Sequence, residues 1–137
     1  MPNSISIGAA YLDQDIDGAT TIASSGLIGF NSAAQTAVTQ ATSKSTGVTA
    51  NTSAGVITMN NASLNSATNV TFTLTNSVIG AKDNVIVTIA SGTATDGTYQ
   101  AWVTTVAAGS CKITLRNISG GSLSEAVVLN FAVIRSR

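Results

Sequence analysis

From residue 55 to residue 134 the chain consists of short apolar or alternating segments, separated by turn residues at intervals of about ten. In residues 70–75, for example, Val70, Phe72 and Leu74 alternate with threonines, which is the pattern of a strand with one buried face. Such segments at this spacing predict an all-β fold, an antiparallel β-sandwich. The expected strands are residues 56–59, 70–75, 84–90, 98–106, 111–116 and 125–134.

The same pattern predicts some details of the sheets. The two most continuously apolar runs, residues 84–90 and 126–134, are expected to be central strands. Asp96 and Gly97 form a pair that is favoured in hairpin turns. Trp102 is expected either in the centre of the core or as an anchor at an interface. The side chains expected in the core are Phe72, Leu74, Ile86, Ile89, Ile113, Leu115, Val128 and Phe131.

Residues 1–42 differ from the rest of the chain. Their strand candidates, residues 5–7 and 27–30, are short, and residues 32–41 have no apolar stripe that would hold a helix. We therefore expect an extended N-terminal arm over residues 1–42, ordered against a partner or the body, and a β-sandwich domain over residues 43–137. The arm has three acids and no base, a charge of −3, whereas the body has six bases and three acids, a charge of +3. This division predicts docking of the arm on a neighbouring subunit, although so few charges can also scatter unevenly by chance.

The composition favours a structural or binding protein over an enzyme. Charged residues make up 9% of the 137 residues, the net charge at pH 7 is zero, and there is no histidine to act as a general base. Zero net charge provides no basic surface for nucleic acid or an anionic membrane, and no apolar run is long enough to span a bilayer. A weakly charged surface lacks the repulsion that keeps monomers apart, which predicts an assembly. The alternative is a small domain with a hydroxyl-rich surface.

One motif resembles a metal site. Asp13, Asp15 and Asp17 alternate and are followed by Gly18, as at the start of a calcium loop. The twelfth position of the loop holds Ser24 where a glutamate is expected, so calcium is a weak candidate. The alternative is an acidic patch that docks on lysines of a neighbour.

No other group of residues predicts catalysis or a cofactor. Cys111 is the only cysteine and begins a predicted strand, which favours a buried apolar role over a reactive thiol. Asp83, Asp96 and Glu125 are far apart in the sequence and would form a glycosidase pair only if the fold brought two of them together. We therefore expect no catalytic residues, no cofactor and no enzyme activity.

The run Ser-Gly-Gly-Ser-Leu-Ser-Glu-Ala-Val-Val-Leu-Asn-Phe-Ala-Val-Ile at residues 119–134 is the most specific part of a wider similarity. Together with residues 40–49, 55–60, 70–76, 107–111 and 115–118, it resembles a β-rich domain of tailed-bacteriophage virion proteins. This domain is often the C-terminal module of capsid decoration or head-fibre proteins and of some tail proteins. The resemblance covers about residues 38–135, and residues 28–30 and 33–35 resemble the preceding segment of the same proteins.

The resemblance implies a jelly-roll-like or immunoglobulin-like sandwich in a homotrimeric structural protein of the virion, with no catalytic residues to carry over. A short arm before a compact domain suits a decoration, or cement, protein that binds the major capsid protein lattice non-covalently on the outer capsid surface. The alternative is a receptor-binding module of a tail or head fibre, and a virion-associated hydrolase is a third possibility. The residues expected at interfaces are Asp13, Asp15, Asp17, Tyr99 and Trp102.

Overall fold

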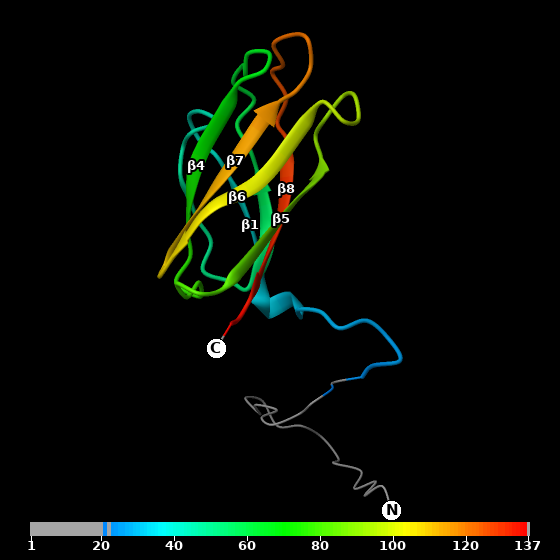
Figure 1. Ribbon diagram of the computed structural model, residues 1–137, viewed down its shortest axis with the longest axis vertical. Helices are drawn as coiled ribbons and strands as arrows, with labels where there is room; N and C mark the ends of the chain where they lie inside the picture. Colours follow the sequence, from blue (N-terminus) through cyan, green and yellow to red (C-terminus); the bar gives the residue numbers. More distant parts are fainter. Residues whose placement is uncertain (1–20, 22, 137) are drawn as a thin grey trace, which may run out of the picture.

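The computed structural model, which describes residues 21 and 23–136, has eight strands in two packed sheets (Figure 1). The expected all-β sandwich is confirmed. A short 3-10 helix, η1 (Ser32–Ala34), precedes the first strand. The strands are β1 (Gln35–Thr39), β2 (Val48–Thr49), β3 (Ala54–Thr58), β4 (Asn69–Thr75), β5 (Asn84–Ser91), β6 (Tyr99–Ala107), β7 (Ser110–Asn117) and β8 (Val128–Ile134).

Both sheets are mixed, because the chain changes sheet at nearly every link. The first sheet has the order β1-β3-β8-β5 and the second the order β2-β4-β7-β6. Each crossing reverses the direction of the chain, so β1 and β3 run parallel, as do β2 and β4. The other neighbouring pairs are antiparallel. The pairing is therefore antiparallel, as expected, except at the parallel β1–β3 and β2–β4 pairs.

The hairpin of the described chain lies at a different turn from the expected one. Asp96 and Gly97 connect β5 to β6, which belong to different sheets, although Gly97 does adopt the positive φ of 77° that favours glycine. The two strands that pair through a two-residue turn are β6 and β7, joined at Ala108 and Gly109, where Gly109 has a φ of 80°. Turn chemistry thus marks where the chain bends, whereas packing decides which sheet the next strand joins.

The first strand lies in the region that the sequence analysis placed in the arm. Residues 27–30, the expected strand, are not in a strand, and β1 begins five residues later, after η1. It packs closely on β3 at Gly55, where an added Cβ would lie 2.5 Å from the Thr36 carbonyl oxygen and 2.7 Å from Cε1 of Phe131. Glycine at this position therefore lets the edge strand join the sheet.

The core between the sheets contains most of the expected side chains. Phe72, Leu74, Ile113, Leu115 and Phe131 are buried, while Ile89 and Val128 are half-buried. Ile86, in contrast, is 48% exposed. Its strand β5 is an edge strand, so the expectation that residues 84–90 are central is wrong, whereas β8 does lie between two neighbours. The run looks continuously apolar because its outward side includes Ile86 as well as the polar Asn84 and Thr88.

Two buried asparagines hold loops against the core. The side-chain nitrogen of Asn117 donates to the carbonyl oxygens of Leu64 and Gly121, at 2.9 and 2.8 Å. The side chain of Asn76 donates to the carbonyl oxygen of Thr52 at 2.8 Å and accepts a hydrogen bond from the Val78 amide. Both side chains are thus satisfied, as buried polar groups must be if they are not to destabilise the fold.

Replacing a core side chain should cost far more than replacing an exposed one on the same scaffold. Leu115→Ala should lower the free energy of unfolding by about 2–5 kcal/mol, because it leaves a cavity between the sheets. Ile86→Ala, at a 48% exposed position, should cost clearly less. Urea unfolding followed by circular dichroism measures both, and equal losses would contradict the assignment of inner and outer faces.

Candidate functional site

The first sheet carries no charged residue in any of its four strands. Their sequences are QTAVT, AGVIT, NVIVTIAS and VLNFAVI. In β8, alternate side chains such as Leu129 and Phe131 are buried in the core. The intervening ones, from Val128 to Ile134, therefore point away from the second sheet. This sheet consequently has an outer face without any charge.

That outer face is aliphatic at one end and hydroxyl-rich at the other. The cross-strand register places Ala54, Ala132 and Ile86 in one row, close to Ile134, which is 50% exposed. This is the end at which β1 and β5 begin and β8 finishes. Uncharged, exposed apolar surface of this kind marks interaction sites. The outer face of the first sheet comprises Gln35, Ala37, Thr39, Ala54, Val56, Thr58, Asn84, Ile86, Thr88, Val128, Asn130, Ala132 and Ile134.

A second apolar surface lies directly before the sandwich, in residues 24–31, which we call the arm segment. Leu27 is fully exposed and Ile28 is 75% exposed. A Cβ added at Gly26 or Gly29 would meet no atom within 4 Å, so the segment makes little contact with its own sandwich. Figure 1 shows it leaving the sandwich at the end where β8 also finishes. The segment contains no charged residue.

Phe30 joins the arm segment to the outer face. Its carbonyl oxygen accepts a hydrogen bond from the side-chain nitrogen of Gln35, at 2.9 Å. The Phe30 side chain borders two shallow hollows, one beside Val56 and Asn130 and the other beside Ile134 and Arg135. The arm segment and the outer face are therefore adjacent surfaces of one interaction region.

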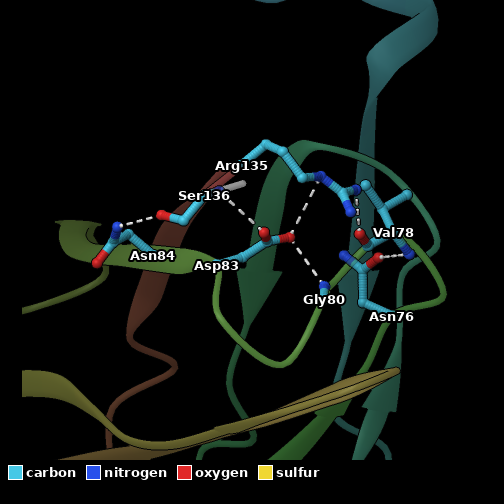
Figure 2. A network of polar contacts seen from close by, with 7 residues as sticks. All are labelled: Asn76, Val78, Gly80, Asp83, Asn84, Arg135 and Ser136. Atoms are coloured by element: carbon cyan, nitrogen blue, oxygen red, sulfur yellow. Dashed lines mark hydrogen bonds and ion pairs between the residues drawn. The ribbon is translucent and has the colours of Figure 1, made fainter.

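A polar network fixes the edge of this region (Figure 2). The Asp83 carboxylate accepts hydrogen bonds from the Gly80 amide at 2.8 Å and the Ser136 amide at 3.1 Å, and lies 3.6 Å from Nε of Arg135. Arg135 also donates to the Val78 carbonyl oxygen at 2.7 Å. The network anchors the chain after β8 to the loop before β5. It thereby holds Ile134 in place at the aliphatic end of the face.

The amide donors around Asp83 lower the pKa of its carboxyl group. The Gly80 amide has the largest effect, and the Ser136 amide and Arg135 add to it against the opposing effect of burial. Because the pKa is lower in the folded chain, the resulting stabilisation is present above about pH 4 and is lost as the pH falls through the folded-state value. The carboxylate form of Asp83 is therefore the one that holds the edge of the site.

Asp83→Asn should lower the melting temperature at pH 7, because the amide cannot accept both backbone hydrogen bonds or pair with Arg135. The difference from the unchanged protein should shrink as the pH is lowered toward 3, where Asp83 itself becomes protonated. Thermal unfolding between pH 3 and 7 measures both. Asp96→Asn is the matched control, since Asp96 is exposed and no hydrogen bond or ion pair of its side chain occurs in the described part of the chain. A difference that stays constant with pH would contradict this role of the carboxylate.

The two aromatic residues expected at an interface lie on opposite faces of β6. Tyr99 is 5% exposed and belongs to the core. Trp102 is half-buried beside Thr114 on the outer face of the second sheet, which also carries Lys112 and Arg116. Within a single chain, only Trp102 of this pair presents surface to a partner. Asp13, Asp15 and Asp17 lie outside the described residues, and their interface and calcium roles stay predictions.

A buried polar cluster closes the end of the sandwich where β1 and β3 finish. Lys44 is buried, and its Nζ donates to the carbonyl oxygens of Asn60 and Glu125. Burial lowers the pKa of Lys44, an effect that the Glu125 carboxylate partly offsets. Burial, and then Glu125, raises the pKa of Tyr99 to about 12. These contacts tie the loop after β1 to the segment before β8, and sequence reasoning did not single out Lys44.

The acidic and cysteine side chains of the described residues form no group suited to metal binding. No group of three or more acidic or cysteine side chains within them could hold a metal ion. Asp83 precedes β5, whereas Glu125 accepts a hydrogen bond from the amide of Ala94 after β5, so the fold places these carboxylates at opposite ends of a strand. Cys111 is buried in the core, as expected, and burial raises the pKa of its thiol to about 11.

The Cys111 thiol should make the protein less stable in alkali. Its pKa is 9.0 in an ordinary setting and about 11 in the fold, so above pH 9 the unfolded chain loses the proton first. The free energy of unfolding should therefore fall between pH 9 and 11. Cys111→Ala should show a shallower fall across that window, whatever its stability at pH 8. Denaturant unfolding at several pH values measures both slopes, and equal slopes would contradict this assignment.

Comparison of the chain with protein-family models, with curated proteins and with solved structures finds no match. In the described part of the chain, no helix has the length and apolar character needed to cross a membrane. The argument for function therefore depends on the surfaces themselves.

Sequence reasoning missed the main candidate surface. It assigned residues 27–30 to a strand and placed Ile86 in the core. The available signal was the absence of charge from residues 45–81 and from residues 84–95, a gap wider than core strands require. An uncharged strand at the edge of a sheet indicates a covered outer face as readily as a central position.

Proposed function

We propose that this chain is a structural protein of a bacteriophage virion, a decoration protein that binds the major capsid protein lattice on the outer surface of the head as a homotrimer. The observation that carries the proposal is the pairing of an exposed apolar arm segment with an uncharged outer sheet face. The apolar side chains of the arm segment and of the aliphatic end of the face are solvated poorly by water, and they gain stability when another chain covers them. The resemblance of residues 38–135 to phage virion domains supports the same proposal.

The proposed mechanism depends on how the protein would be attached to the subunits of the shell. The sandwich provides a rigid body and the arm provides reach, so one copy can contact two neighbouring subunits. A standard stable interface buries about 1,600 Å² in total. Repeating modest contacts over a lattice adds avidity that no single contact supplies. Internal pressure then has to break these contacts as well as those of the shell. No catalytic step and no cofactor are part of this proposal.

A receptor-binding module of a tail or head fibre is the second candidate. It is favoured by a shallow hollow where β5 and β6 meet, lined by Thr88, Gln100 and Trp102 among others. An aromatic side chain beside hydroxyl and amide groups suits a polar ligand. The arm segment has no role in this alternative, which is why we place it second.

The location in the virion decides between the two candidates. Antibodies against the sandwich, coupled to gold, should label the heads of the phage that carries this sequence, at many sites per particle. Label confined to tail tips or head fibres would overturn the decoration proposal in favour of the receptor-binding module. The heads of particles made without the protein should also rupture at a lower temperature, because the shell lacks the added contacts.

The same particles test the arm. Purified protein should bind heads that lack it, and Asp13→Asn, Asp15→Asn and Asp17→Asn together should weaken binding more at low salt than at high salt, where charges are screened. Asp96→Asn in the body is the control. If the three substitutions leave binding unchanged at every salt concentration, the charge of the arm does not contribute to attachment.

A further inference from the structure

We propose that the arm segment of one copy of this chain packs on the outer face of the first sheet of a second copy. The proposal rests on the self-association in the proposed function but is independent of binding to a capsid. It assigns the apolar part of the arm to a neighbouring copy and names the surface that receives it. The steps are the exposure of the segment, the direction in which it leaves the body, and its fit to the face.

The large apolar side chains Leu27 and Ile28 of the arm segment are left uncovered by their own sandwich. Leu27 and Ile28 are 102% and 75% exposed, whereas other large apolar side chains of the described chain are mostly buried. Fully covering side chains of this size is among the larger single contributions to association. A segment that presents them in adjacent positions is therefore a strong candidate for covering by another surface.

Local hydrogen bonds hold the end of the segment, Phe30 and Asn31, beside η1 and β1. The side-chain oxygen of Asn31 caps η1 by accepting from the Ala34 amide at 3.1 Å. The Gln35 side chain binds the Phe30 carbonyl oxygen at 2.9 Å. Together these bonds set the angle at which the chain enters β1, and Figure 1 shows the segment running outward beyond the end of the sandwich.

The outer face of the first sheet matches the segment in chemistry and position. It is uncharged throughout, so covering it removes no charge from water. Its aliphatic end, where Ile86 and Ile134 are 48% and 50% exposed and Ala54 is already buried, lies at the end from which the arm leaves. Copies arranged around an axis with these ends together therefore bring each arm segment near a neighbour's aliphatic surface.

The stoichiometry also favours a second copy as the occupant. Every chain carries one arm segment and one outer face, and the two surfaces are different. Contacts between different surfaces are head-to-tail, and they leave nothing uncovered only when they close into a ring. A trimer is a small ring of this kind. Within such a ring, each copy supplies the surface that covers its neighbour's exposed one.

Three variants of the full chain test the contact with the same chemistry at each site. Leu27→Lys with Ile28→Lys alters the arm segment, and Ile86→Lys alters the face. Ile118→Lys is the matched control, because Ile118 is 44% exposed after β7 and belongs to neither surface. Circular dichroism establishes that each variant is folded. Light scattering coupled to size exclusion then measures mass over a range of concentrations.

We expect the unchanged chain and Ile118→Lys to assemble, and the arm and face variants to run as single chains of 13.7 kDa. A mixture of the arm and face variants is the decisive sample. One supplies an intact face and the other an intact arm segment, so a single contact can form and the mass should rise to that of a pair.

A mixture that stays at the mass of single chains would overturn the proposal, as would assembly by either variant alone. If the unchanged protein has the mass of a single chain at all concentrations, the proposed contact between copies is also overturned. The labelling of virions would then still test the decoration function separately. If the unchanged chain assembles but the variants do so equally, self-association stands and this assignment of its surfaces is wrong.

Discussion

The packing of β7 against β8 across the middle of the sandwich supports the rest of the structure. Ile113 and Leu115 of the second sheet and Leu129 and Phe131 of the first belong to one buried cluster. Both strands lie inside their sheets, so each is hydrogen-bonded to a neighbouring strand on either side. Apolar burial is the dominant favourable term in folding, and these two central strands contribute to a cluster that also draws residues from the other strands and loops. Every surface described above is positioned by this contact.

The route of the chain around that core explains where the apolar surfaces end up. Because successive strands alternate between sheets up to β6, most contacts join residues far apart in the sequence. The first strand consequently sits at the edge of the first sheet, held by the close approach at Gly55. The arm segment is attached to that edge through Phe30 and Gln35. A change in β1 would therefore alter both the sheet edge and the direction of the arm.

The two sheets also differ in what they offer to a partner. The strands of the first sheet have no charge, whereas those of the second carry Lys112 and Arg116 and a half-buried Trp102. An uncharged face can be covered by another apolar surface at little electrostatic cost, while a basic, hydroxyl-rich face remains well solvated. A body with two unlike faces suits a component that contacts copies of itself on one side and other molecules on the other.

The sequence by itself determined the fold class, the positions of six strands and most of the core, because alternation with period two is a local pattern that burial imposes directly. It did not determine the neighbours of those strands. Asp96 and Gly97 make a turn in either topology, and only packing sends β6 to the other sheet. Ile86 was expected in the core because the sequence does not distinguish an apolar side chain on an outer face from one on an inner face. The burial of Lys44 and the network around Asp83 depend on loops that meet only in three dimensions. Tertiary structure therefore decided the order of the strands and the outward position of Ile86 in β5, and with them the candidate site.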